Sequence, residues 1–447
     1  MGKKLYLTCV WLSIMLMLSI VGCAKEPLPD QAVTLKVMVY DKDTFTKEYG
    51  SQLTVTFPNV ELQVIETLTL RQDDSPEEEP GEKLIKFIEQ ENPDLILLEP
   101  DQVMPLADKG KLLELDPVMK QENFDPTGIP ENMMDYFRQT GNGTLYAIAP
   151  TYTPSVIYYN IDLFKRHHIE FPRNQMTWEE LFTLAARFGQ LGTMEKPIYG
   201  IADHLYAYKL TSIFNVAHTL NLSITDPRGE KLQFQAEGWK YVFRMVTDMM
   251  KNKALYTTDE EVMFSNANDN PFSREEVAMQ VHTPITSKYT LIGESTAQLG
   301  VVTMPVNPVN PEESPFISLD SMYAINAASD QKQLAWKVLD YMIGPEMAKL
   351  NTQNFISTGS LPIRNAHIQK VGEWEAQPYV MLKPSVHAGW SGDIIRKSKI
   401  SDSMKEETIN AMENAVDEIV KNNKPVDEVL AAMQKELQAK LDIELNK

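Results

Sequence analysis

Short apolar segments alternate with amphipathic segments along the first hundred residues, and this order limits the folds open to the chain. Residues 33–40 alternate apolar and polar side chains and then become almost wholly apolar, and residues 93–98 contain a second apolar run. Residues 82–91, between them, carry apolar side chains at helical spacing on one face. Strands and helices in this order predict a parallel α/β sheet with buried strands.

The same alternation continues toward the carboxyl end. Thr177 and Glu180 form a capping-box pair that predicts the start of a helix, and residues 329–342 and 404–445 have helical periodicity, with a break at 422–425. Further strands are expected at residues 61–70, 145–149, 155–160, 277–281 and 299–304. With 447 residues the chain is too long for one core, so two or three domains are expected.

The first residues have the order of an export signal. Lys3 and Lys4 precede an apolar run at residues 5–21, which ends at Gly22 and Cys23. This junction resembles a bacterial lipobox, in which a signal peptidase cuts before the cysteine and the thiol receives a lipid. A retained membrane helix is the alternative, because about 17–25 apolar residues can span a bilayer.

The expected result is a chain anchored at the outer face of the cell membrane. Residues 1–22 would be the signal peptide and residues 23–32 a tether, with Cys23 carrying a lipid anchor that includes palmitate. Cys9 is the only other cysteine. The mature chain would therefore have no other thiol for a disulfide, a zinc cluster or thiol catalysis.

The chain is acidic, with a formal net charge of −20 at pH 7. Nucleic-acid binding needs a basic footprint, so nucleic acid is excluded as a partner. The acidic run at residues 73–82 lacks EF-hand spacing and the histidines are scattered, so we expect no metal site and no cofactor. The neighbouring His167 and His168 leave a metal or anion receptor as an alternative.

Several segments, taken in order, resemble the family 1 extracellular solute-binding proteins of ABC importers, which include maltose-binding protein. The segments match the family's strands, helices and crossing points from about residue 33 to residue 429. They are residues 93–98, 106–115, 143–150, 156–164, 172–180, 300–305, 322–329 and 335–346. Each match is weak alone, but their order and separations together indicate the family.

The resemblance implies a two-lobed α/β fold of the periplasmic-binding-protein type, with lobes joined by crossing strands and a ligand cleft between them. The first lobe would combine residues 33–148 with 305–343, and the second would combine 149–304 with 344–447. The implied function is capture of a small polar ligand, a sugar or oligosaccharide, for the permease of an ABC-type importer. The protein is expected to act as a lipid-anchored monomer.

A sugar site needs carboxylates or amides for hydroxyl groups and flat aromatic rings for C–H faces. Open α/β sheets bind ligands at the carboxyl ends of their strands. Asp101 follows the strand at 93–98 and matches a family position that binds sugar hydroxyls, although an exposed loop acid is the structural alternative. The other candidates in this lobe also lie at strand ends: Tyr40, Asp41, Gln102, Asp320 and Ser321.

The second lobe offers two aromatic candidates. Tyr152 follows the crossing at Pro150, and Trp390 lies between glycines in residues 388–392, near a position where family members supply a stacking ring. The structural alternatives are a packed hinge residue for Tyr152 and a core residue for Trp390.

Two departures from the family weaken the case for a sugar without affecting the fold. Residues 280–285 lack the glycine and tryptophan that many sugar-binding members carry there, and Leu98 replaces a frequent aromatic residue. His282 and Thr283 are the side chains available in that segment, and a structural histidine is the alternative.

An enzyme is the rival class. A glycosidase needs two carboxylates about 5–10 Å apart across a cleft, and no short motif pairs acids in this way. Gly-x-Ser-x-Gly and His-Glu-x-x-His motifs are both absent. We therefore expect a binding protein with no catalytic residue. A carbohydrate-active enzyme and a ligand-sensing receptor of the same fold stay open as alternatives.

Overall fold

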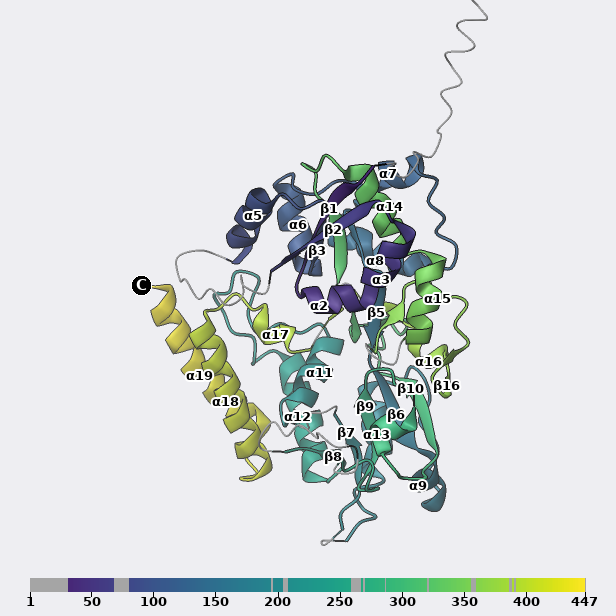
Figure 1. Ribbon diagram of the computed structural model, residues 1–447. Helices are drawn as coiled ribbons and strands as arrows, with labels where there is room; N and C mark the ends of the chain where they lie inside the picture. Colours follow the sequence, from purple (N-terminus) through teal and green to yellow (C-terminus); the bar gives the residue numbers. More distant parts are fainter. Residues whose placement is uncertain are drawn as a thin grey trace, which may run out of the picture. The chain divides into compact units, whose positions relative to one another are not determined.

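The computed structural model describes most of the chain after the first 30 residues. The described residues are 31–67, 80–193, 196–203, 208–258, 267, 270–285, 287–319, 321–354, 359–385, 388–389 and 391–446. The predicted signal peptide, Cys23, Asp320 and Trp390 lie outside them. The described residues contain both helices and strands (Figure 1), which confirms the α/β class.

The chain divides into two compact units. The first lies within Met1–Thr127, Phe137–Ile148 and Ser321–Gly344, and the second lies within Gly128–Tyr136, Ala149–Asp320 and Pro345–Lys447. The chain therefore passes between units several times, as a two-lobed fold requires.

Residues 128–136 are grouped with the second unit instead of the first lobe, and Gly344 with the first unit instead of the second lobe. Residues 305–320 also differ from their predicted assignment, because the structure groups them with the second unit. The amide of Val306 donates to the carbonyl of Met176 at 2.9 Å, and the amide of Ser155 donates to Phe316 at 2.8 Å. These long-range bonds hold the segment within the second unit, and neither partner is recognisable from local sequence.

A five-stranded sheet lies at the centre of the first unit, in the order β2-β1-β3-β13-β4. Strand β1 is parallel to β2 and β3, whereas β13 is antiparallel to β3 and β4. The sheet is mixed, which corrects the prediction of a wholly parallel sheet, because an apolar run reads alike in either direction. The strands are β1 (Val33–Val39), β2 (Val60–Glu66), β3 (Leu95–Leu98), β4 (Ala147–Ile148) and β13 (Met322–Ile325).

Helices flank this sheet. One continuous helical segment follows β1 and contains a single π-helical stretch, η1, between two α-helical pieces. The helical elements are α2 (Lys42–Phe45), η1 (Thr46–Gly50), α3 (Ser51–Thr56), α5 (Pro80–Glu91), α6 (Pro100–Asp108), α7 (Leu115–Gln121), α14 (Lys332–Met342) and α8 (Glu131–Thr140), which is divided between the units.

The second unit has its own five-stranded sheet, in the order β10-β6-β9-β7-β8. Strand β7 is parallel to β8 and β9, and β6 is antiparallel to β9 and β10. The strands are β6 (Val156–Asn160), β7 (Tyr199–Ala202), β8 (Leu255–Tyr256), β9 (Val277–His282) and β10 (Leu299–Thr303). A smaller sheet joins β5 (Thr151–Pro154) to β12 (Ile317–Ser318) and β14 (Leu361–Pro362). The remaining short strands are β11 (Glu313–Ser314), β15 (Lys370–Val371), β16 (Trp374–Glu375) and β17 (Lys383–Pro384).

The predicted capping box is confirmed at the start of α10, where the amide of Glu180 donates to Thr177 Oγ1 at 3.2 Å and Glu180 Oε2 accepts from the Thr177 amide at 2.9 Å. The helices of this unit are α9 (Ile161–Arg166), α10 (Trp178–Ala186), α11 (Thr211–Thr219), α12 (Glu237–Lys251), α13 (Lys288–Ile292), α15 (Pro345–Asn354), α16 (Gln377–Val380), α17 (Asp393–Arg396), α18 (Asp402–Val420) and α19 (Val426–Leu445).

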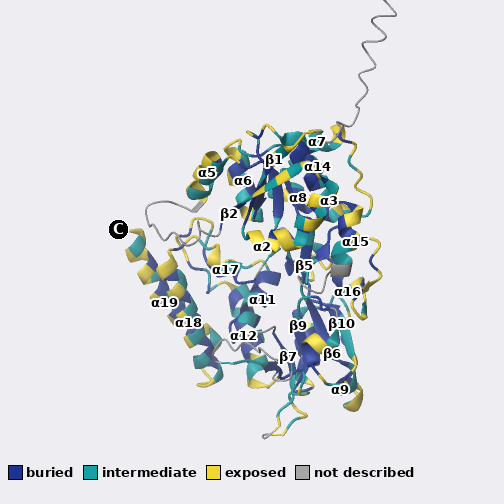
Figure 2. Cartoon of the chain, viewed as in Figure 1, coloured by how far each residue is buried: buried dark blue, intermediate teal, exposed yellow. Residues whose placement is uncertain are grey.

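The long carboxyl-terminal helices complete the core of the second unit. Helices α18 and α19 form a hairpin, and their break falls at the predicted residues 422–425. Buried side chains of both helices join one hydrophobic cluster with residues from α10, α11 and α12. Figure 2 shows the strands of both sheets largely buried and the outer faces of α18 and α19 exposed. Among the described helices, none is both long enough and apolar enough to cross a membrane.

Candidate functional site

The strand directions of the first unit gather polar residues at one sheet edge. The carboxyl ends of β1, β2 and β3 share this edge because the three strands are parallel. Antiparallel β13 begins there, since Met322 pairs with Leu98. We call this the first sheet edge, and define it by Tyr40, Asp41, Thr67, Asp101, Gln102 and Ser321. It brings together the described candidates that the sequence predicts for the first lobe.

Asp41 has a local structural role at this edge. Its Oδ1 accepts the amide of Thr44 at 2.7 Å and caps helix α2. Hydrogen bonds from the side chain and the amide of Thr44 lower the pKa of the Asp41 carboxyl. The carboxylate is therefore ionised at neutral pH and held in one orientation.

Asp101 lies in the first turn of α6, which begins at Pro100, and not in a loop. Proline at the first helical position is compatible with this start. Asp101 is exposed, and the partial positive charge of the helix amino terminus favours a carboxylate there. The side chain thus presents a negative charge to solvent at the first sheet edge.

Gln102 is engaged in the start of the same helix. Its side-chain Oε1 accepts a hydrogen bond from the backbone amide of Glu99 at 2.9 Å. Its backbone amide donates to the backbone carbonyl of Glu99 at 3.0 Å. These bonds fix the turn that carries Asp101.

Tyr40 and Ser321 are partly buried, directly after β1 and directly before β13. Thr67, which the sequence did not single out, is 7% exposed and its Oγ1 donates to the carbonyl of Val39 at 3.2 Å. Its position one residue after β2 was the available signal.

Aromatic side chains underlie this edge. The ring of Tyr323 lies 6.4 Å from Tyr49 and 6.5 Å from Phe45, centroid to centroid. Burial raises the pKa of the Tyr49 and Tyr323 hydroxyls, and it also raises the pKa of the neighbouring Glu48 carboxyl. Tyr49 and Glu48 lie in η1, and single π-helical turns occur often at functional sites.

The second unit has an equivalent edge. The carboxyl ends of parallel β7, β8 and β9 meet there, and Val156 at the start of β6 pairs with His282 at the end of β9. We call this the second sheet edge, and define it by Asp203, Thr258, His282 and Thr283.

Asp203 is the ionisable group at the second sheet edge that sequence reasoning missed. It follows β7 directly and is 5% exposed. Its Oδ2 accepts from Ser212 Oγ at 2.5 Å and its Oδ1 accepts from Asn215 Nδ2 at 2.7 Å. Burial raises the pKa of its carboxyl to about 6, against the lowering effect of these two hydrogen bonds. The available signal was an acid directly after an apolar strand.

His282 and Thr283 form a short structural unit. His282 Nδ1 lies 2.8 Å from the carbonyl of Thr283, and burial lowers the pKa of the imidazole. Its ring meets Tyr158 edge to face at 6.3 Å, and the hydroxyl of Tyr158 lies 2.9 Å from that of Tyr379. This network favours the structural reading of the histidine.

Tyr152 lies in β5 and is 2% exposed. Its hydroxyl accepts from Asn365 Nδ2 at 2.7 Å, and burial raises its pKa. A buried and hydrogen-bonded phenol favours the packed alternative over the predicted ligand contact.

The residues beside Trp390 form the loop that the flanking glycines predict. Gly389 has φ of +151°, and its amide donates to the carbonyl of Pro315 at 2.8 Å. Asp393 follows and pairs with Arg396 at 2.7 Å and Lys397 at 3.0 Å. Burial alone would raise the pKa of the Asp393 carboxyl, but the two cations leave it below its usual value.

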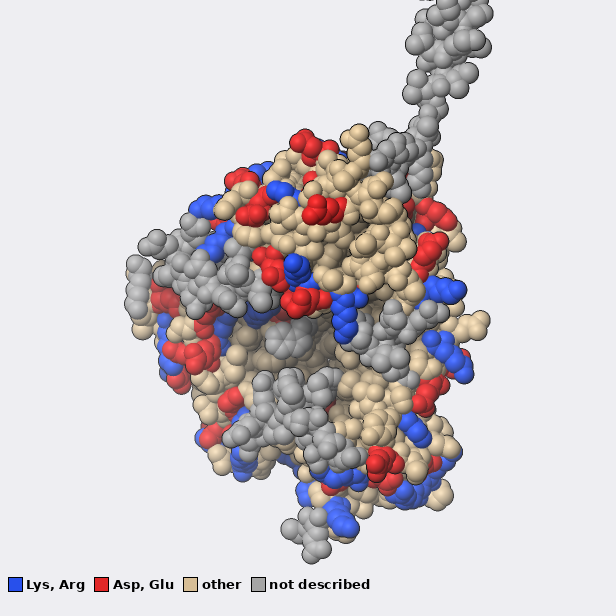
Figure 3. All heavy atoms as spheres, in the orientation of Figure 1, with Lys and Arg blue, Asp and Glu red and all other residues tan. Residues whose placement is uncertain are grey.

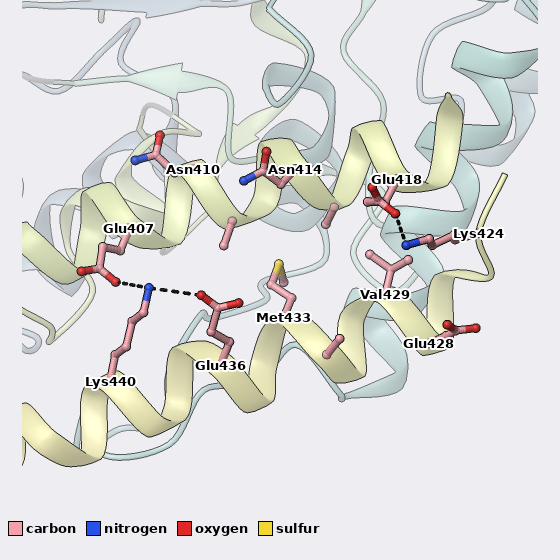
Figure 4. Close-up of a pocket in the computed structure, with 13 residues that line it drawn as sticks. Glu407, Asn410, Asn414, Glu418, Lys424, Glu428, Val429, Met433, Glu436 and Lys440 are labelled. Carbon is pink, nitrogen blue, oxygen red and sulfur yellow. Dashed lines mark ion pairs between the residues drawn. The ribbon is translucent and has the colours of Figure 1, made fainter. Parts of the chain in front are cut away.

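A groove of about 400 Å³ lies between α18 and α19 (Figure 4). Lys440 of α19 pairs with Glu407 of α18 at 2.8 Å across it and with Glu436 of its own helix at 3.3 Å, and Lys424 pairs with Glu418. No aromatic ring is among the residues that line it. It therefore lacks the stacking surface of a sugar site, and we assign it no ligand.

Surface charge and metal-binding side chains are two further features that could mark a site. Acidic and basic side chains are interspersed over the face drawn in Figure 3, without a single basic field. Among the residues that the structure describes, no group of three or more His, Cys, Asp or Glu side chains is placed to hold a metal ion.

Solved structures similar to this chain share its fold. A sugar transporter from Rhizobium etli, in an open conformation, has a TM-score of 0.60 at 18% identity, covering 91% of this chain and 100% of its own. An ABC substrate-binding protein from Listeria monocytogenes in complex with cycloalternan has a TM-score of 0.56 at 15% identity. The match covers 93% of this chain and 100% of that protein. The sugar-binding protein MalE from Xanthomonas citri has a TM-score of 0.61 at 15% identity. The match covers 92% of this chain and 98% of that protein. No curated protein sequence matches this chain.

At these identities the likeness establishes the fold alone, which is the two-lobed α/β fold of periplasmic binding proteins. The family assignment comes from the sequence, where the model for bacterial extracellular solute-binding proteins matches residues 68–381, more than half of the chain. The predicted family is thereby confirmed: this chain belongs to the bacterial extracellular solute-binding proteins, whose structural neighbours are MalE-like sugar-binding proteins of ABC transporters.

Proposed function

We propose that this protein captures a sugar or oligosaccharide outside the cytoplasm and delivers it to the permease of an ABC importer, without chemical conversion. One observation carries the proposal. Strand directions place Tyr40, Asp41, Asp101 and Ser321 at a single sheet edge, where open α/β sheets bind their ligands.

The chemistry of the first sheet edge suits a polyhydroxylated ligand. The carboxylates of Asp101 and Asp41 accept hydrogen bonds from hydroxyl groups, and the hydroxyls of Tyr40 and Ser321 both donate and accept. Gln102 would act by fixing the helix turn that carries Asp101. Asp320 and Trp390 remain proposed contacts, with Trp390 supplying a stacking ring.

The same proposal includes the anchor. Cys23 would carry the palmitate-containing lipid that holds a monomeric receptor at the outer membrane surface, close to its permease. A tether raises the effective concentration of the receptor near its partner.

Calorimetric titration tests the ligand class, with maltose, maltotriose, cycloalternan and D-mannitol as probes. We expect at least one to bind and to raise the melting temperature, because a ligand of the folded state stabilises it. Asp101→Ala should weaken binding of that probe by about 10- to 100-fold, since it removes a charged acceptor worth roughly 1.5–3 kcal/mol.

Asp108→Ala is the matched control, because Asp108 is an exposed acid at the other end of α6. Equal affinity of the two variants would remove Asp101 from the site. Failure of every probe to bind would refute the proposed ligand class. Chromatography of maltotriose after incubation tests for conversion, and any hydrolysis product would favour the enzyme alternative.

A further inference from the structure

The described residues between β7 and α11, Asp203 and 208–210, make contacts with neighbouring elements. On the strand side, the buried carboxylate of Asp203 accepts from Ser212 and Asn215 in the first turns of α11. On the helix side, Tyr208 forms a parallel bridge with Thr258, which follows β8. These contacts tie the second sheet edge to the start of α11.

Helix α18 supplies a further attachment. The hydroxyl of Tyr208 donates to the carboxylate of Glu413, and Lys209 Nζ lies 3.2 Å from Asp417 Oδ2. Glu413 and Asp417 are four residues apart, so both point from the same face of α18. Two consecutive residues just before α11, Tyr208 and Lys209, therefore contact one helix from the carboxyl-terminal part of the chain.

The ion pair between Lys209 and Asp417 compensates a buried positive charge. Lys209 is 8% exposed and lies just before α11, where the partial positive charge of the helix amino terminus repels an ammonium group. A buried charge needs a partner of opposite sign, and Asp417 provides one. The same carboxylate also pairs with Lys421 at 3.3 Å.

Helix α18 is packed into the core of the second unit. Its buried face, beside the one that carries Glu413 and Asp417, contributes Met412, Val416 and Ile419 to that core. The ribbon in Figure 1 shows α18 beside α19 and α12, away from the strands themselves. The contacts that link α18 to the residues before α11 are therefore made by the side chains of Glu413 and Asp417.

We infer that Glu413 and Asp417 are positioning residues: they hold Tyr208 and Lys209, and so restrain the start of α11 beside the second sheet edge. This edge is formed by the carboxyl ends of parallel strands, where open α/β sheets bind ligands. The inference deepens the proposed function and rests on it for the ligand-binding part. The mechanical part, which is restraint of the start of α11 by α18, stands on the contacts alone.

The test compares Asp417→Asn with Asp427→Asn in the full chain. Both changes remove one carboxylate charge without altering shape, and Asp427 pairs with Arg244 at 2.7 Å between α19 and α12, away from the sheet edge. Hydrogen exchange of the amides of residues 208–215 and calorimetric affinity for whichever of maltose, maltotriose, cycloalternan or D-mannitol binds are measured for each.

We expect Asp417→Asn to speed exchange at residues 208–215 by about tenfold through local opening. It should also weaken probe affinity by about tenfold, with a melting temperature no lower than that of Asp427→Asn. Glu413→Gln should move both quantities in the same direction, and Asp417→Glu should restore them. A role confined to stability would lower the melting temperature of Asp417→Asn and leave affinity unchanged, which would overturn the inference.

Unchanged exchange in both Asp417→Asn and Glu413→Gln would also overturn it. If Asp417→Asn does not fold, the double variant Lys209→Gln with Asp417→Asn removes both charges of the pair together. Amide exchange at residues 208–215 as slow as in the wild type would then show that α18 does not restrain α11. If the wild type binds none of the probes, the proposed ligand class fails, while the exchange rates still decide whether α18 restrains α11.

Discussion

The two sheet edges carry acids in opposite environments. At the first edge, Asp101 is exposed in a helix first turn and Asp41 caps a helix at the surface. At the second edge, Asp203 is buried and both its oxygens accept hydrogen bonds from the same unit. The comparison shows that strand ends alone do not make equivalent sites: one edge presents charge to solvent, whereas the other uses its charge to organise the chain.

The pH dependence of stability separates the edges most strongly. The folded-state pKa of Asp203 is raised to about 6 from an ordinary 3.8, so this group adds stability below pH 3.8 and loses it as pH rises through 6. The full difference is about 3 kcal/mol. The pKa of Asp41 is lowered, so its contribution has the opposite sign and disappears as pH falls below 3.8.

Urea denaturation at pH 4.5 and pH 7 measures the difference. Asp203→Asn cannot titrate, so the free energy of unfolding of this variant should change less between the two values than that of the wild type. Identical pH profiles for the two proteins would show that Asp203 has an ordinary pKa in the folded state.

Removal of the Asp203 carboxylate is the next largest effect. Asp203→Ala leaves the Ser212 hydroxyl and the Asn215 amide without their acceptor, and should lower the free energy of unfolding at pH 7 by about 1–3 kcal/mol. Chemical denaturation of this variant beside Asp101→Ala gives the comparison directly. Equal stability of the two variants would mean that the edges do not differ as described.

Tyr152 sharpens the distinction between packing and binding within the second unit. Tyr152→Phe removes the bond from Asn365 and should lower the free energy of unfolding by about 1 kcal/mol, while probe affinity stays unchanged. Calorimetry and thermal unfolding of the same preparation measure both. A large loss of affinity with normal stability would restore the predicted ligand contact.

Asp101→Ala should have the smallest effect on folding. An exposed side chain away from buried networks changes the free energy of unfolding by no more than about 0.5 kcal/mol. The expected signature is therefore weaker probe binding at nearly unchanged stability, read from titration and denaturation together. A loss of more than 1 kcal/mol would indicate that the carboxylate supports α6 instead of a ligand.

Local patterns predicted the parts of the structure that depend on near neighbours. The capping box at Thr177 and the break at residues 422–425 follow from backbone hydrogen bonding within a few residues. The start of α6 at Pro100 is harder to predict, because proline is common in loops and also at the first helical position. The ligand roles at the first sheet edge stay predictions.

The sequence by itself determined the α/β class, the solute-binding family and the polar residues at the ends of β1 and β3, because strand periodicity and short-range capping are local properties. Only the tertiary structure decided the antiparallel direction of β13, the burial of Tyr152, the grouping of residues 305–320 and the pairing of Lys209 with Asp417. Each of these depends on groups far apart in the chain, and the burial and charge compensation that fix them exist only once the chain has packed.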